Sequence, residues 1–480
     1  MTVSIVHAGR TALTATLAIA LAACGGGGPS EPPPTSGSPT PTPPAPTCSI
    51  ANQIDFADDV LNEWYLFPDL LDDTVDPASF TSVQDFLDAR VAPAREAGRD
   101  RGFTFATSIE EENELIRSGS TAGFGIRLVY DTTNDRVFLT EAFENGPGFQ
   151  SGLDRGSELL GIGTDAGNLE LVSTLMANGG PRAVIDALGP SQPGLTRVIR
   201  FRQTDGTIIE TTIAKAEFEL DPISDRYGVE ILRDGGRNIG YLNLRTFIVD
   251  DAIPQLRDAF ATFNANGVTE LVIDLRYNGG GLVRVAEVLG DLLGEGRVGE
   301  VFSRTVLRPS KSSENETEFF EDEPNALRPS KIAFITSRSS ASASELIINS
   351  MLPYLGEDDI ALIGSNTSGK PVGQFGFDFA ECDLRIRAVT FKTVNALGDG
   401  DYFDGLASTI PNTCRALDDI FTPLGDPRED RIATAVDFLS GRACTPISGG
   451  PEQTAQSVNP RRVLQPERPN TIQHENPGVF

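Results

Sequence analysis

The chain of 480 residues carries 68 acidic and 39 basic side chains, which gives a formal net charge of −29 at neutral pH. This length predicts two or three domains that can bury a large core. So acidic a chain lacks the basic face that nucleic acids require, which excludes a nucleic acid partner. The acidic residues are spread along the chain, which indicates a solvated acidic surface.

Residues 1–23 predict an export signal. The apolar run over residues 11–23 is too short to cross a bilayer but suits the core of a signal peptide. It leads into the Leu-Ala-Ala-Cys-Gly sequence of residues 21–25, which resembles the end of a bacterial lipoprotein signal. We therefore expect Cys24 to be lipidated and to become the mature N-terminus; ordinary cleavage beside an incidental cysteine is the alternative. Because Gly25 rather than Asp follows, we expect the outer membrane of a bacterial cell envelope, facing the periplasm.

Two segments are too polar or too rich in glycine and proline to form a core. Residues 24–47 predict a solvated tether, and residues 446–480 predict a disordered tail. The two histidines, His7 and His474, fall in the signal and in this tail. We therefore expect no imidazole in the folded body, which excludes a Ser-His-Asp triad and any His-bearing zinc site there. No metal or organic cofactor is expected.

Four cysteines remain after Cys24, namely Cys48, Cys382, Cys414 and Cys444. None stands in a Cys-x-x-Cys motif, so a metal or redox site is not expected. An exported compartment permits disulfides, and four cysteines allow three pairings. We favour Cys382 with Cys414 and Cys48 with Cys444, because the second bond would tie the two ends of the body together.

The first part of the body is expected to be helical and the next part to be β-rich. Within residues 48–114, apolar residues recur at helical spacing over 54–61 and 83–88. Residues 115–217 carry short strand-like runs separated by glycine-rich turns.

The order of strands and turns in residues 115–217 resembles a PDZ domain. That resemblance implies a loop whose backbone N–H groups bind a peptide carboxylate while the peptide adds a strand to the sheet. The implied peptide-binding residues are Gly123, Phe124, Gly125 and Ile126. A generic small β-module is the alternative.

Residues 218–445 predict an α/β core with a mostly parallel sheet. Strand-like and helix-like runs alternate, with strands expected at 239–244, 270–275, 331–336 and 360–364 and helices at 252–263, 282–293 and 344–355. Functional residues of such a sheet gather beyond the carboxyl ends of its strands.

The Ser-Ala-Ser-Ala-Ser-Glu sequence of residues 340–345 follows one of these strands and opens a helix. Backbone N–H groups at a helix N-terminus favour a developing oxyanion, so Ser342 is a candidate nucleophile. The alternative is structural, because Ser342 and Glu345 also fit a Ser-x-x-Glu capping box.

A serine nucleophile without histidine needs another base, and lysine is the candidate. The chain holds five lysines, and Lys370 lies in a glycine-flanked loop after a strand, 28 positions beyond Ser342. A solvated loop lysine is the alternative. A third loop, residues 274–281, ends in three glycines whose N–H groups could approach a ligand closely.

Together these motifs resemble the C-terminal processing peptidases, also called tail-specific proteases. The resemblance covers about residues 115–415 and implies a crotonase-like βαβ spiral core preceded by a PDZ domain. It implies a nucleophile, a base and a residue that orients the base, which are Ser342, Lys370 and Gln374. The implied oxyanion donors are the N–H groups of Ala343 and Gly280, and the implied supporting residues are Asp274, Arg276 and Glu345.

The sequence therefore predicts an exported, lipid-anchored serine endopeptidase with a Ser-Lys dyad and no metal. Its expected substrates are proteins or peptides presented by an unstructured, free C-terminus, and its oligomeric state is left open. The alternative is a catalytically silent scaffold that binds peptide C-termini. The retention of Ser342, Lys370 and Gln374 favours the enzyme.

Overall fold

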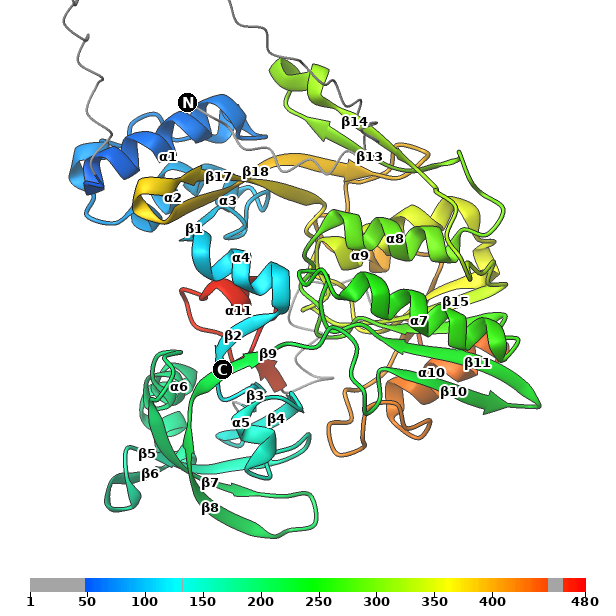
Figure 1. Ribbon diagram of the computed structural model, residues 1–480, viewed down its shortest axis with the longest axis horizontal. Helices are drawn as coiled ribbons and strands as arrows, with labels where there is room; N and C mark the ends of the chain where they lie inside the picture. The colour runs from blue at the N-terminus through cyan, green and yellow to red at the C-terminus, as the bar shows by residue number, and fades with distance from the viewer. Residues whose placement is uncertain (1–47, 132, 448–460) are drawn as a thin grey trace, which may run out of the picture.

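A six-stranded sheet forms the centre of the protein. The computed structural model describes residues 48–131, 133–447 and 461–480 (Figure 1). The strand order is β10-β11-β12-β15-β16-β19, with β10 antiparallel to β11 and all later neighbours parallel. The strands are β10 (Val229–Asp234), β11 (Arg237–Asn243), β12 (Glu270–Asp274), β15 (Lys331–Thr336), β16 (Ile360–Gly364) and β19 (Asn412–Arg415). The predicted parallel core is confirmed.

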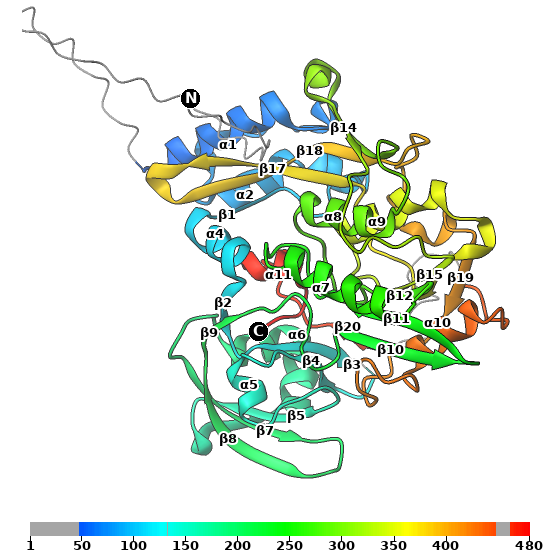
Figure 2. The same ribbon diagram turned by 45° about the vertical axis from the view of Figure 1, so that its right-hand side comes forward.

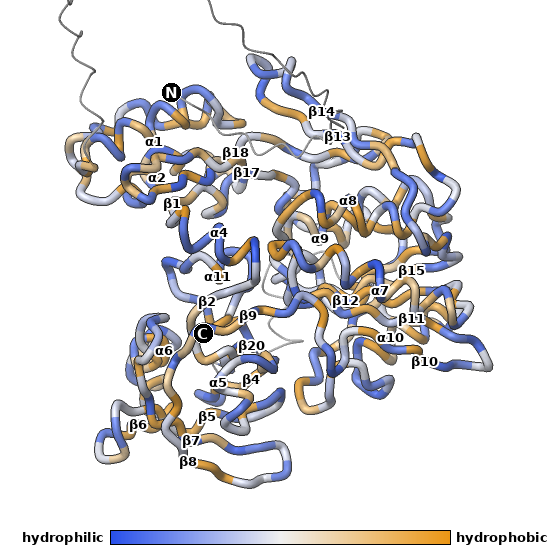
Figure 3. The backbone as a smooth tube through the Cα atoms, in the orientation of Figure 1, coloured by the Kyte–Doolittle hydropathy of each residue, from blue (hydrophilic) through white to orange (hydrophobic). Residues whose placement is uncertain are grey.

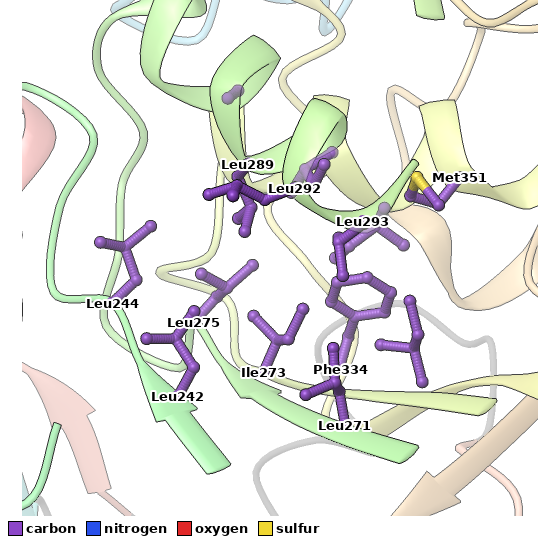
Figure 4. Close-up of a cluster of buried hydrophobic side chains, with 14 of the residues drawn as sticks. Leu242, Leu244, Leu271, Ile273, Leu275, Leu289, Leu292, Leu293, Phe334 and Met351 are labelled. Atoms are coloured by element: carbon purple, nitrogen blue, oxygen red, sulfur yellow. The ribbon is translucent and has the colours of Figure 1, made fainter. Parts of the chain in front are cut away.

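Helices cover both faces of this sheet, as a buried parallel sheet requires. One face packs against α7 (Ala252–Ala265), α8 (Val283–Leu293) and α9 (Ala343–Met351), and the other packs against α10 (Asp430–Leu439). Figure 4 shows Leu289, Leu292 and Leu293 of α8 facing Ile273 and Phe334 of the strands. Packing on both faces fixes the positions of the strands and of their carboxyl ends.

A second sheet links the N-terminal helices to the core. β18 (Leu384–Val394) pairs antiparallel with β1 (Phe105–Ser108), β13 (Val301–Leu307) and β17 (Val372–Phe379), and β14 (Glu316–Phe319) extends β13. The helices are α1 (Ile50–Trp64), α2 (Val83–Arg90), α3 (Ala92–Glu96) and α4 (Ile109–Ser118). The first two pack on β17 and β18 (Figures 1 and 2). The N-terminal region is thus mainly helical, but its one strand belongs to a sheet of the core.

The β-rich module is a third unit, drawn in cyan and green at the lower left of Figure 1. Its main strands are β3 (Ile126–Asp131), β4 (Arg136–Ala142), β5 (Glu158–Gly163), β7 (Thr196–Arg202) and β8 (Ile208–Ala214), with β6 (Leu169–Leu171) paired to β5. Its helices are α5 (Pro147–Gln150) and α6 (Val172–Leu188), and β2 (Ser120–Gly123) pairs with β9 (Ala216–Glu219) where the module joins the rest.

The expectation of a disordered tail over 446–480 is wrong for its second half. Residues 461–480, here called the tail segment, contain β20 (Arg461–Val463) and α11 (Thr471–Glu475) and run between the module and the core (Figure 1). β20 pairs antiparallel with β3. Leu464, Ile472 and Phe480 are buried, so a few apolar residues attach the tail segment to the body although its composition is mainly polar.

The favoured disulfide pairing is also wrong. Cys48 is bonded to Cys382, and Cys414 to Cys444, with Cα–Cα distances of 5.2 and 5.4 Å. Cys382 lies in the turn between β17 and β18, beside the N-terminal helices, and therefore meets Cys48 rather than Cys414. The actual pairing is one of the three that the sequence allowed.

Hydropathy follows this architecture. Figure 3 shows hydrophobic stretches along α8 and α9, and a more hydrophilic α4 at the surface. Among the described helices none is both long enough and apolar enough to cross a bilayer. Cys24 and the rest of the predicted signal and tether lie outside the described residues.

Candidate active site

Three loops meet at the carboxyl ends of neighbouring parallel strands. The loop of residues 275–282 follows β12, residues 337–342 follow β15, and residues 365–371 follow β16. These strands are adjacent in the sheet, so their loops converge at one edge. The two motifs and the glycine-rich loop singled out in the sequence are therefore brought together.

Ser342 lies in a strained turn that presents it at the start of α9. Its φ of 54° and ψ of −116° fall where residues other than glycine are rarely found, and such strain is typical of functional turns. The neighbouring serines have structural partners, because the Ser340 and Ser344 hydroxyls donate to the Leu275 and Asn278 carbonyls at 2.7 and 2.9 Å. The hydroxyls on either side of Ser342 are thus held by the loop after β12.

The carboxylate of Glu345 joins the nucleophile turn to the lysine loop. One of its oxygens, Oε2, accepts the N–H of Ser342 at 3.2 Å and the N–H of Lys370 at 2.7 Å, while Oε1 accepts the N–H of Gly369 at 2.6 Å. The expected capping box of Ser342 and Glu345 is thus present, and the Glu345 carboxylate also binds the lysine loop. Burial raises the pKa of the Glu345 carboxyl, and the three N–H donors oppose that rise.

Lys370 is buried, with its side chain only 6% exposed. Its Nζ lies 5.2 Å from the centre of the Phe103 ring and 3.9 Å from Glu475 Oε1. Gln374 lines the same cavity of about 120 Å³ and donates from Nε2 to the Phe103 carbonyl at 2.9 Å. The alternative of a solvated loop lysine is excluded, and the base candidate lines a small cavity.

The two expected oxyanion donors differ in their present bonding. Ala343 is the first residue of α9, where N–H groups have no intrahelical partner. A Cβ on Gly280 would lie 2.7 Å from Ser342 Cβ, so only glycine fits against the nucleophile. The Gly280 N–H donates to Asn278 Oδ1 at 2.9 Å, whereas the Gly279 N–H donates to the Glu475 carbonyl at 2.9 Å.

Asp274 and Arg276 support the site from below. Arg276 is completely buried and binds Asp274, both carboxylate oxygens of Glu429 (2.7 and 2.9 Å) and Asp418. These anions hold the pKa of Arg276 well above its usual range despite burial, so it is a permanent buried cation. The network fixes the β12 loop to the N-terminus of α10, which is a scaffolding role.

Comparison with known proteins places this site in a family. A model described as "Peptidase family S41" matches residues 238–405, and one described as "Peptidase S41 N-terminal domain" matches residues 52–105. The first match contains all three loops of the site.

Residues 52–105 and 238–405 are thus S41 peptidase domains, of the kind found in the C-terminal processing peptidases.

Relatives within the S41 family agree with this placement. A probable CtpA-like serine protease of Staphylococcus aureus (strain bovine RF122 / ET3-1) is 24% identical over 309 residues, covering 62% of this chain and 54% of the relative. The chloroplastic C-terminal processing peptidase of Tetradesmus obliquus is 27% identical over 280 residues, covering 55% of this chain and 54% of the relative. This chain thus spans about half the length of the curated relatives that it matches.

A solved structure shares the S41 fold. The crystal structure of a Bacteroides fragilis NCTC 9343 protein assigned to the S41 proteases matches with a TM-score of 0.62 at 22% identity, covering 80% of this chain and 97% of that one. At this identity the likeness establishes the fold.

The carboxylate-binding loop predicted in the β-rich module is occupied. The N–H groups of Phe124 and Ile126 donate to the backbone oxygen of Phe480 at 2.9 and 3.3 Å. A Cβ on Gly123 would lie 2.7 Å from the Phe480 carbonyl carbon, and Gly125 has a φ of 68° that favours glycine. The structure therefore brings Gly123, Phe124 and Ile126 against a backbone segment of the same chain, whereas Gly125 packs against Gly146.

The expectation of no imidazole in the folded body is wrong. His474 stacks on Phe105 with ring centres 3.6 Å apart and lines the cavity that holds Lys370. Burial and the charge of Lys370 lower the pKa of His474 to about 3, which makes it a poor base at neutral pH. Sequence reasoning missed it because no local pattern shows where a short polar segment docks; the apolar Ile472 was the available signal.

Proposed function

We propose that this protein is an exported serine endopeptidase that uses Ser342 and Lys370 as a catalytic dyad. The observation that carries the proposal is the Glu345 carboxylate, one oxygen of which binds the N–H groups of both residues. This contact sets the distance between nucleophile turn and base loop. The S41 relationship supports the serine peptidase class.

The proposed reaction needs only groups of this chain and water. Ser342 Oγ attacks the peptide carbonyl as Lys370 Nζ takes the hydroxyl proton, and the ammonium then protonates the departing amine. The Ala343 N–H, with Gly280 beside it, stabilises the oxyanion. Water then attacks the acyl-enzyme, again with Lys370 as base. Gln374 is proposed to orient the lysine.

The substrates that we propose are proteins or peptides with an unstructured C-terminus, received by the β-rich module acting as a PDZ domain. An extended peptide that pairs with β3 would place its carboxylate at the N–H groups of Phe124 and Ile126. We also propose that lipidated Cys24 anchors the protein to the outer membrane on the periplasmic side. Two disulfides in the body support an oxidising compartment.

The decisive test compares Ser342→Ala with Ser340→Ala and Ser344→Ala. We expect Ser342→Ala to abolish cleavage of an unstructured protein such as casein while keeping the melting temperature near that of the parent. The other two lose a buried hydrogen bond, which costs about 1 kcal/mol of stability, and should keep measurable activity. Casein cleavage by Ser342→Ala at the parental rate would rule out the dyad.

A further inference from the structure

The last residues of the tail segment bind the β-rich module as an added strand. The Phe480 N–H donates to the Ile126 carbonyl at 2.9 Å, and the Leu128 N–H donates to the Gly478 carbonyl at 2.9 Å. With the two N–H groups that bind the Phe480 oxygen, this is an antiparallel ladder along the edge of β3. Phe480 is 4% exposed and belongs to the core cluster of the module.

The residues immediately before this strand cross the candidate active site. The Glu475 carbonyl accepts the Gly279 N–H, and the Glu475 carboxylate lies 3.9 Å from Lys370 Nζ. His474 and Pro477 line the cavity shared with Lys370 and Gln374. An ion pair requires the ammonium form of a lysine, whereas a general base requires the free amine.

The conformation of this stretch differs from that of an extended substrate. Thr471–Glu475 forms α11, and the Asn476 N–H donates to the Ile472 carbonyl at 2.8 Å, so the backbone beside the active site is a helix end. A peptidase can therefore hold these residues without presenting them for attack. Glu475 Oε2 and Asn476 Oδ1 are buried without a hydrogen-bond partner in the described structure, which favours reversible binding.

We propose that residues 470–480 are an intramolecular pseudosubstrate that occupies two places at the same time. One is the peptide groove, which is the edge of β3 with the N–H groups of Phe124 and Ile126, and the other is the catalytic cleft, which is the cavity lined by Lys370 and Gln374. Substrates gain access by displacing it with a large, apolar residue in the position that Phe480 occupies. This inference rests on the proposed function and adds to it a substrate class and a means of regulation.

Tethering makes the competition strong. β20 lies on the same edge of β3, so the pseudosubstrate is held beside its own groove at an effective concentration of the order of millimolar. A free peptide can bind only the small fraction of molecules whose segment is released, so its apparent affinity is reduced by that fraction. Displacement should raise that affinity at least tenfold.

The experiment measures peptide binding in the full chain carrying Ser342→Ala, which removes cleavage from the readout. The probe is a fluorescein-labelled synthetic peptide of residues 476–480, which carries the strand that binds β3 but not Glu475, and its binding is followed by anisotropy. Phe480→Glu places a charge in the apolar position and should release the tethered copy while leaving the groove intact. We expect the probe to bind this variant at least tenfold more tightly than the parent, and Glu467→Gln, an exposed change in the same segment, to behave as the parent.

A second variant acts at the loop after β12 instead of at the edge of β3. The atoms nearest to a Cβ on Gly279 all belong to the Glu475 backbone, at 2.5 to 3.2 Å, so Gly279→Ala should expel the segment without altering its sequence. It should likewise tighten probe binding several-fold. Equal binding to the parent and to both folded variants, or binding to none, overturns the pseudosubstrate. In enzymes that keep Ser342, tighter probe binding without any proteolysis would contradict the proposed function and leave this inference standing.

Discussion

At the scale of single residues, the site depends on one carboxylate. Glu345 gathers the N–H groups of Ser342, Gly369 and Lys370, although these belong to loops after different strands. Ser342 holds a backbone conformation that costs roughly 1–3 kcal/mol, and such strain persists only where surrounding bonds over-determine it. The Glu345 bonds supply that restraint, so the proposed nucleophile and the proposed base are held in place without a substrate.

Lys370 should be replaceable by no other basic side chain. Lys370→Arg should lower kcat/KM by about 100-fold or more, because guanidinium stays protonated and cannot accept the serine proton. Lys370→Ala should be equally inactive, whereas Gln374→Ala should be weakened only.

The measurement is a pH profile of peptide cleavage in the Phe480→Glu background, where tail release no longer contributes. Lys392→Arg is the matched control, because that lysine is partly exposed and pairs with Asp401 at the surface. An active Lys370→Arg enzyme would leave Ser342 without its base.

Acid should loosen the tail segment through His474. The docked imidazole has a pKa of about 3, and a free one has about 6.5. Above pH 6.5 both states are neutral and docking is complete; below it only the released segment takes up the proton, so docking weakens as pH falls toward 3. The ring stacks on Phe105, and Lys370 is the charged group that acts on it.

Hydrogen exchange of residues 471–480 at pH 7.5 and 5.0, corrected for intrinsic rates, tests this. We expect several-fold greater opening at pH 5.0 in the parent, and no such change in His474→Phe, which keeps the stacking but cannot titrate. An identical pH response in both proteins would assign the effect to another group.

At the scale of elements, α10 is attached to the sheet by charge. Glu429 caps this helix by accepting the N–H groups of Arg431 and Ile432, and it also binds Arg276 with both oxygens. Glu429→Gln keeps the shape of the side chain but removes one of the anions that bind Arg276. The free energy of unfolding measured in urea should therefore fall by about 3 kcal/mol. Asp437→Asn on the same helix removes an exposed pair with Arg442 and should cost less than about 0.5 kcal/mol. Similar losses for both variants would argue against the network.

Elements built from local pattern were predictable from the sequence. The strands around 270–275 and 331–336 are continuous apolar runs, and the loops after them carry glycine and serine at positions that the strand ends impose. The tail segment was not predictable in this way. Its helix is one turn long, and its order comes from contacts with β3, the Lys370 cavity and α4, which are distant in sequence.

At the scale of the whole molecule, two disulfides close loops of very different size. Their cysteines are separated by 334 and 30 positions. Removing either pair as Cys→Ser should cost about 2–4 kcal/mol, and chain entropy makes the longer loop the costlier by roughly 2 kcal/mol. Urea unfolding of the Cys48→Ser/Cys382→Ser and Cys414→Ser/Cys444→Ser proteins gives the comparison, and a non-reducing digest identifies the linked peptides. A Cys48–Cys444 peptide would contradict the structure.

The pairing itself could not be derived from the sequence, because all three connectivities are compatible with the spacing. It follows from tertiary position: Cys382 reaches the N-terminal helices only because β17 and β18 pack under α1. Four strands of the central sheet, β11, β12, β15 and β16, needed no such information, because each has its own apolar pattern, whereas β10 and β19 were not predicted.

The bond between Cys48 and Cys382 also determines how the body would respond to a mechanical load. A pull on the chain before Cys48 reaches the covalent bond before it reaches α1, which starts at Ile50. The force therefore passes directly into the turn between β17 and β18, so α1 is shielded from being peeled off turn by turn. Because β17 begins two residues after Lys370, tension on the chain before Cys48 would reach the hairpin that adjoins the proposed base.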